Sequence, residues 1–138
     1  MRLGPKDFLL YTVPAVLWAL AIFAFSSVPS EDLPKLAILS QDKLLHLTAY
    51  LGFGFLLERA FRHQRVFPRL ARQSKLAAIL CAAIYGMSDE FHQSFVPGRS
   101  MDPWDLLADV LGVVLAMVLL LAYGRFRERR STVPPATR

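Results

Sequence analysis

The amino-acid sequence predicts an all-α membrane protein: four transmembrane helices in a bundle, both termini in the cytoplasm, and a polar site at the extracytoplasmic end. Three observations predict it, namely long apolar runs, the placement of lysine and arginine, and polar residues at helical spacing. Of the 138 residues, 54% are hydrophobic, against about 45–50% in an ordinary soluble domain. A chain of this length has room for one domain.

Four apolar stretches supply the predicted spans, because a helix that crosses a bilayer needs about 20 mostly apolar residues. They run from about Phe8 to Val28, Leu44 to Phe61, Leu76 to Phe95, and Trp104 to Tyr123. The first exceeds the roughly 7–15 apolar residues of a signal peptide, so we expect a retained helix, which Pro14 can kink. Residues 1–125 form the predicted transmembrane domain, and we expect residues 126–138 to be a basic, disordered cytoplasmic tail.

The basic residues orient the predicted spans. Thirteen of the sixteen lysines and arginines precede the first span, follow the fourth, or lie around the connection between the second and third. By the positive-inside rule these segments are cytoplasmic. Because the basic residues flank apolar runs and form no single face, the net charge of +5 does not indicate nucleic acid as a partner. Eight of the eleven acidic residues fall on the extracytoplasmic side, where they bear on function.

Polar residues at helical spacing form a stripe on each of the last three spans. The stripes are Asp42, His46 and Tyr50; Tyr85, Asp89 and His92, with Gln93 beside Asp89; and Asp102, Asp105 and Asp109. All three end at the extracytoplasmic level. The apolar part of the third span, Leu76 to Met87, is too short to cross, so polar residues complete it. Ionisable residues at that depth mark a candidate functional site facing the bundle interior or a wet cavity.

Simpler roles compete for the same residues. Helix capping or the helix dipole would suffice for Asp42, Asp102 and Asp105. Interhelical hydrogen bonding would suffice for His46, His92 and Asp109. Arg99 could simply pair with a nearby acid, and Glu90 could be a rim or pairing residue.

The segment from Asp89 to Arg99, DEFHQSFVPGR, resembles the signature of the VanZ-like family, and so does DKLLH at Asp42 to His46. The resemblance covers roughly residues 10–123 and implies a multi-pass protein of the bacterial cytoplasmic membrane. The family takes its name from a member linked to low-level resistance to the glycopeptide teicoplanin. The site residues that the resemblance carries over are Asp42, Lys43, His46, Tyr50, Asp89, Glu90, His92, Gln93, Pro97, Arg99, Asp105 and Asp109. Many relatives carry Asn at the position of Asp109.

Three functions fit such a site. The first is a non-catalytic envelope factor that binds a lipid-linked or cell-wall-related headgroup, or an amphiphile such as a lipoglycopeptide, among the membrane lipids. The second is a hydrolase or transferase acting on an envelope lipid, with His46 or His92 as general base, Asp89 orienting it, and Arg99 or Lys43 steadying a phosphate. The third is a transporter or channel subunit whose carboxylates and histidines relay protons.

We favour binding, because no nucleophile–base pair is evident in the sequence, and leave the enzyme question open. No cofactor is predicted. The aspartates and histidines could hold a divalent cation, although their spacing fits no standard metal motif. The excess of acids disfavours a phosphate substrate unless a metal offsets it. Gly52, Gly54 and Gly112 permit close helix contact, either within one chain or in an oligomer.

Overall fold

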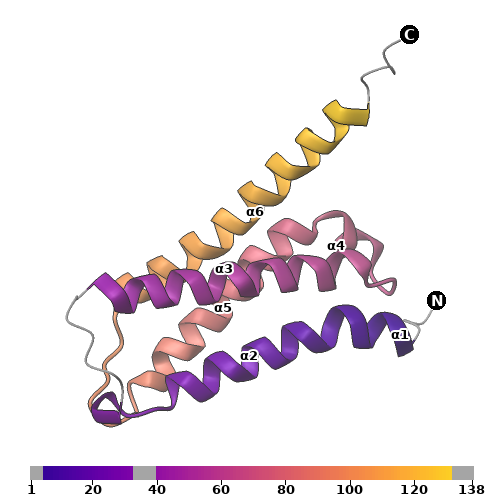
Figure 1. Ribbon diagram of the computed structural model, residues 1–138. Coiled ribbons are helices and arrows are strands. Elements are labelled where there is room, and N and C mark those ends of the chain that lie inside the picture. The colour runs from indigo at the N-terminus through magenta and orange to yellow at the C-terminus, as the bar shows by residue number, and fades with distance from the viewer. Residues whose placement is uncertain (1–4, 33–39, 132–138) are drawn as a thin grey trace.

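The computed structural model describes residues 5–32 and 40–131, and every regular element within these ranges is a helix (Figure 1). The elements are α1 (Pro5–Asp7), η1 (Phe8–Thr12, a π-helix), α2 (Val13–Ser26), η2 (Ser30–Asp32, a 3-10 helix), α3 (Ser40–His63), α4 (Pro68–Arg72), α5 (Ser74–Gln93) and α6 (Pro103–Ser131). The all-α prediction is confirmed for these residues, and each of the four apolar stretches lies mainly in one long helix.

The first apolar stretch is a continuous run of helix, α1–η1–α2, with one widened turn. In that turn the backbone N–H of Val13 donates to the carbonyl of Phe8, five residues back. The next residue, Pro14, has no N–H, and its ring would clash with a carbonyl in an unbroken α-helix. A π turn is one of the ways in which a helix adapts at such a point, so the proline predicted to kink this helix lies beside the irregular turn.

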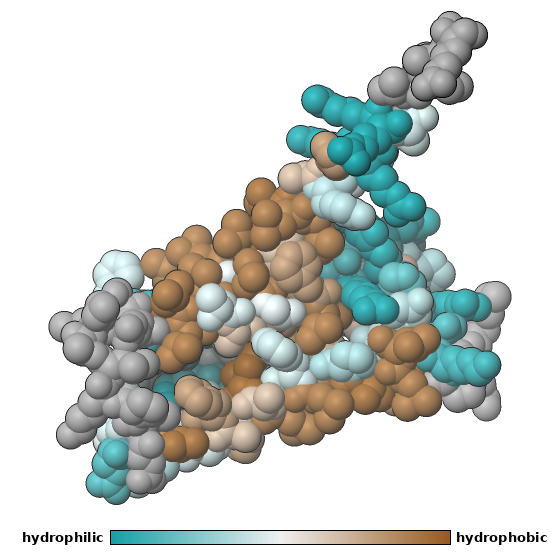
Figure 2. All heavy atoms as spheres, viewed as in Figure 1, coloured by the Kyte–Doolittle hydropathy of each residue, from teal (hydrophilic) through white to brown (hydrophobic). Residues whose placement is uncertain are grey.

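Two segments, Phe8–Ser26 and Pro103–Ser131, are long and apolar enough to cross a membrane by length and composition. Helices α3 and α5, with 24 and 20 residues, are also long, but polar and charged residues interrupt their apolar stretches. Even so, large apolar side chains such as Leu44 on α3 and Ile84 on α5 are exposed. Figure 2 shows this hydrophobic surface across the middle of the molecule, with hydrophilic residues gathered mainly where α4 and the far part of α6 lie.

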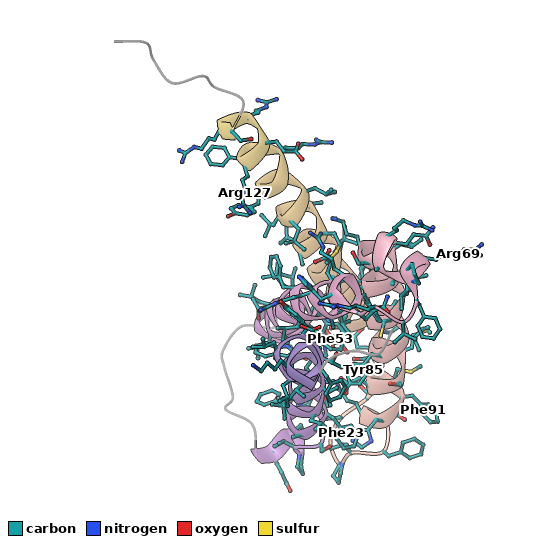
Figure 3. All side chains as sticks on the ribbon, turned by 90° about the vertical axis from the view of Figure 1, so that its right-hand side faces the viewer. Phe23, Phe53, Arg69, Tyr85, Phe91 and Arg127 are labelled. Atoms are coloured by element: carbon teal, nitrogen blue, oxygen red, sulfur yellow. The ribbon has the colours of Figure 1, made fainter. Side chains whose placement is uncertain are left out.

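The two ends of the bundle differ in charge. At one end α1 meets the end of α3, where Arg65 pairs with Asp7 at 3.2 Å and His63 stacks on Tyr11 with ring centroids 4.0 Å apart. We call this end, toward which Figure 3 shows Arg69 and Arg127, the arginine end. The opposite end, which we call the acidic end, holds Asp42, Asp89, Glu90, Asp102, Asp105 and Asp109.

Close packing of α3 against α6 aligns the elements that carry the site. A Cβ atom at Gly112 would overlap the carbonyl of Leu47, and one at Gly54 would lie 3.2 Å from the Cα of Val113. These two glycines therefore serve contacts inside the chain. Beneath the acidic end the core is apolar, built around Tyr50, Phe53, Leu57, Ala78, Ala82, Val113, Ala116 and Met117.

The start of the predicted tail is a correction. Helix α6 continues to Ser131, so residues 126–131 are helical where we expected disorder. Arginine and glutamate are good helix formers, and Arg129 and Arg130 in the last turn favour the helix dipole. The rest of the tail, 132–138, lies outside the described residues, as does Lys35 in the connection before α3.

Candidate functional site

The candidate site centres on three side chains, one from each of three helices. His46 on α3 places its Nδ1 2.9 Å from Oδ1 of Asp109 on α6. Glu90 on α5 completes the group. One side-chain nitrogen of His46 and one carboxylate oxygen from each acid, the atoms that could ligate a metal, lie within 4.8 Å of one another. Glu90 is 2% exposed and Asp109 is fully buried. We call His46, Glu90 and Asp109 the buried triad.

Lys43 ties α3 to the start of α6 beside the triad. Its Nζ donates to Oδ2 of Asp102 and to Oδ1 of Asp105, each at 2.8 Å. The hydrogen bond with Asp102, then that with Asp105, raises the pKa of Lys43 above its usual 10.5. The same bond to Lys43 lowers the pKa of Asp102 below its usual 3.8. Asp102 also accepts from the N–H of Trp104 at 2.9 Å, so it caps α6 as the simpler reading predicted.

Glu90 is buried where the sequence placed it on the rim, which is a correction. Its Oε2 accepts the backbone N–H of Asp102 at 2.8 Å. The end of the connection between α5 and α6 therefore contacts this side chain. Helical spacing on α5 could not show this, because Asp102 belongs to a connection of irregular structure.

Asp89 belongs to a second polar group, between α2 and α5. Its Oδ2 accepts from Ser26 Oγ at 2.7 Å and from Gln93 Nε2 at 3.1 Å. Arg99 donates to Gln93 Oε1 at 3.0 Å and to the carbonyl of Val28 at 3.1 Å. Within the described residues Arg99 forms no ion pair with an acid, so its simpler predicted role is not seen.

His92 lies apart from the buried triad. Its Nε2 is 3.0 Å from Ser27 Oγ, and its ring lies on that of Phe23 with centroids 4.5 Å apart. The hydroxyl of Ser27 donates its proton to the carbonyl of Phe23 at 2.7 Å, so toward His92 it can only accept. The pair is therefore not a serine activated by a base, and the carboxylate bonded to His46 is Asp109, not Asp89.

A cavity of about 420 Å³ lies between α2 and α3 and is bordered by part of this network. Its polar lining includes Ser26, Asp42, His46, Thr48, Asp89 and Arg99, and its apolar lining includes Trp18, Ala21, Ile22, Phe25, Leu45 and Ala49. Tyr50 also lines it, and within the described residues the hydroxyl of Tyr50 and Oδ1 of Asp89 are buried without a hydrogen-bond partner. The cavity thus joins an apolar wall to polar groups with unused bonding capacity.

Sequence reasoning missed the contribution of the first helix. Trp18 and Ser26 lie on α2 and Ser27 is its C-cap residue, and the sequence of this helix showed no signature. The one available signal was the pair of serines that ends the apolar run at the same level as the acids.

Reasoning from the sequence also missed Glu58, which is 3% exposed near the arginine end. Its Oε1 accepts from Ser74 Oγ at 3.0 Å and from Arg62 Nε at 2.7 Å, with Lys75 Nζ 3.9 Å away. We call these four residues the Glu58 cluster. Figure 3 shows Phe53 and Tyr85 between the helices, in the apolar middle of the bundle. The polar groups at the two ends are thus separated by the apolar core.

Comparisons with known proteins place the chain in a family. The VanZ/LLP1 family model matches residues 8–124. The chain is also 32% identical over 111 residues to the uncharacterized protein C11E3.10 of Schizosaccharomyces pombe. The aligned segment covers 78% of this chain and 65% of the length of that protein. No solved structure matches. Since that relative comes from a yeast, membership by itself does not imply a bacterial membrane. With its two apolar helices the chain is of membrane-protein type, and it belongs to the VanZ/LLP1 family.

Proposed function

We propose that this protein binds an amphiphile in the cavity between α2 and α3. The headgroup lies among Asp42, His46 and Asp89, and the apolar chain lies along the wall that contains Trp18 and Leu45. The observation that carries the proposal is the cavity itself, where one continuous lining changes from apolar side chains to buried polar groups. Ligand sites commonly combine an apolar wall with a few such polar groups.

We propose that the chain crosses the membrane four times, with both termini in the cytoplasm and the cavity in the outer leaflet. Three features support it. The basic residues gather at one end. Large apolar side chains are exposed on α3 and α5, as on the two more hydrophobic helices. The ionisable side chains at membrane depth, such as Asp89 and Asp109, face the interior of the bundle.

The polar lining favours a headgroup rich in hydrogen-bond donors. Asp42 and Asp89 offer carboxylate oxygens, and Oδ1 of Asp89 is without a partner within the described residues. Carboxylates accept from hydroxyl and ammonium groups. Sugars and amines of a lipid-linked or cell-wall-related headgroup supply such donors. A lipoglycopeptide such as teicoplanin combines these groups with an acyl chain, so a resistance role of that kind is one form of the proposal.

Trp18 provides a direct test, because it lies in the cavity wall and the chain has only one other tryptophan. In a Trp104→Phe background, the purified protein in detergent is titrated with a glycosyl diacylglycerol that carries a nitroxide on its acyl chain. We expect saturable quenching of Trp18 fluorescence. Ala21→Phe fills the cavity, and its ring occupies the space of the acyl chain. It should therefore raise the probe concentration at half-maximal quenching at least about tenfold.

The matched control is Ala77→Phe, the same substitution in a surface groove lined by α5 residues such as Leu80. It should leave the midpoint unchanged. Quenching that rises linearly with probe concentration, or that Ala21→Phe and Ala77→Phe affect equally, would mean that the probe only partitions into the micelle. Either result would overturn the proposal.

A second candidate is the hydrolase or transferase, favoured by one observation. Asp109 holds His46 by its Nδ1, and His46 lines the cavity. A histidine oriented by a buried carboxylate is the arrangement of a general base. If it acts so, incubation with the same glycolipid yields a product that His46→Gln protein does not form. Binding without product by the wild-type protein would leave only the first candidate.

A further inference from the structure

Among the described residues, the acidic end buries more carboxylates than its cations neutralise. Asp89, Glu90, Asp105 and Asp109 are each at most 5% exposed. Of the nearby cations, Lys43 is bonded to Asp102 and Asp105. Arg99 bonds to neutral oxygens instead. Among the cations that the structure describes at this end, this leaves His46, which is charged only when protonated, beside Asp109. A buried, unpaired carboxylate is strongly unfavourable, so such a group calls for a compensating positive charge.

The buried triad also has oxygen atoms without partners. Glu90 uses Oε2 to accept from Asp102, and Asp109 uses Oδ1 toward His46. Within the part of the chain that the structure describes, Oε1 of Glu90 and Oδ2 of Asp109 are buried and have no hydrogen-bond partner. Both belong to side chains whose donor atoms converge with that of His46 within 4.8 Å. Buried polar atoms of this kind require an explanation, and a bound cation is one that also supplies the missing charge.

We propose that the buried triad binds one divalent cation. His46 supplies a nitrogen ligand, and Glu90 and Asp109 supply carboxylate oxygens. One imidazole and two carboxylates form a donor set suited to Zn²⁺ and, with less preference, to Mn²⁺. Three protein ligands leave a coordination position for water or for a ligand. His46 also lines the cavity, so the cation lies next to the place where a headgroup is proposed to bind.

A second group of potential ligands, Asp42, His46 and Asp105, is the weaker candidate. Its donor atoms also lie within 4.8 Å of one another. However, Asp42 is exposed, and Asp105 already accepts from Lys43 at 2.8 Å. A cation there would compete with a lysine and with water. Within the described residues no lysine is paired with the buried triad, and Glu90 and Asp109 are buried from solvent. The two groups also differ in residues that can be changed separately.

The test measures the metal alone, without any amphiphile, so its outcome does not depend on the proposed function. The purified full-length protein in detergent is stripped with a chelator, exchanged into metal-free buffer, and titrated with Zn²⁺. We expect about one equivalent to be retained through gel filtration by elemental analysis, with a rise in the unfolding temperature. Asp109→Asn and Glu90→Gln should each weaken Zn²⁺ binding at least about tenfold, because each removes a charged ligand.

Two controls locate the site. Asp42→Asn changes the weaker group only, and His92→Gln changes the histidine that lies apart; both should retain Zn²⁺ like the wild-type protein. If the wild-type protein retains neither Zn²⁺ nor Mn²⁺, the inference is wrong. It is also wrong if Glu90→Gln and Asp109→Asn retain the metal fully, or if Asp42→Asn loses as much as they do.

Discussion

The Glu58 cluster and the buried triad are two answers to the same physical problem, a carboxylate inside an apolar bundle. Glu58 is 3% exposed and Glu90 is 2% exposed, so burial does not distinguish them. Their partners do. Glu58 accepts a hydrogen bond from Ser74 and forms ion pairs with Arg62 and Lys75, whose side chains are partly exposed. Glu90 receives one backbone N–H and keeps a buried oxygen without a partner among the described residues.

The difference separates a structural ion pair from a candidate binding site. In the Glu58 cluster the charge is neutralised inside the chain, and long side chains carry the opposite charge out to solvent. In the buried triad the described residues supply two carboxylates with buried oxygens that have no partner, and we infer that a bound cation supplies the positive charge. Burial of an acid alone therefore does not mark a site, whereas burial with unused bonding capacity does.

The largest expected effect is a difference in sign between two identical substitutions. Glu58→Gln removes the charge that holds Arg62 and Lys75, and should lower the free energy of unfolding by about 2 kcal/mol. Glu90→Gln keeps an acceptor for the N–H of Asp102 but removes an unneutralised buried charge. In metal-free protein it should raise the free energy of unfolding by about 1 kcal/mol.

Both variants are measured by denaturant unfolding in detergent with a chelator present. Adding Zn²⁺ should then stabilise the wild-type protein and the Glu58→Gln variant but not the Glu90→Gln variant. If both substitutions destabilise the metal-free protein by the same amount, the two carboxylates are equivalent and the comparison fails.

Gly86 offers a smaller and more local perturbation of the buried triad. A Cβ atom there would lie 3.0 Å from Oδ2 of Asp109 and 3.5 Å from the ring of Tyr50. Gly86→Ala should lower the free energy of unfolding by about 1 kcal/mol through overpacking and weaken Zn²⁺ binding by displacing Asp109. Gly124→Ala is the matched control, since no atom of the described residues lies within 4 Å of its added Cβ. The control should be slightly stabilising by helix propensity; equal loss of Zn²⁺ binding in both variants would contradict the reading.

The sequence predicted the helices and most residues of the triad, because both depend on periodicity along a helix. His46 and Asp109 belonged to separate stripes, and the structure brings them to 2.9 Å. The direction of each stripe followed from helical spacing alone. The level at which the stripes meet followed from the lengths of the apolar runs.

What the sequence could not predict depends on packing between elements. His92 shares a face with Asp89, yet the position of α2 gives it Ser27 and Phe23 as partners. Glu90 is buried and contacts a connection with no periodic pattern. Such contacts are set by how the helices cross, which a single sequence does not encode in any one stretch.

The smallest expected effect concerns the surface link between Lys43 and Asp102, outside the buried triad. The pKa of Asp102 is lowered, so its contribution to stability is complete above its usual 3.8 and is lost as the pH falls through the lowered value. The pKa of Lys43 is raised, so its contribution is complete below its usual 10.5 and is lost at higher pH.

Asp102→Asn retains the helix cap but removes the charge. Its unfolding temperature should fall slightly below that of wild type between these limits and converge with it outside them. Lys43→Met removes this pair and also the hydrogen bond to Asp105, so its unfolding temperature should fall further, and adding Asp102→Asn to it should change little, because the Lys43–Asp102 pair is already lost. A difference that persists unchanged in strong acid would mean that Asp102 acts through its shape and cap, and that the acidic end holds no pH-dependent surface pair.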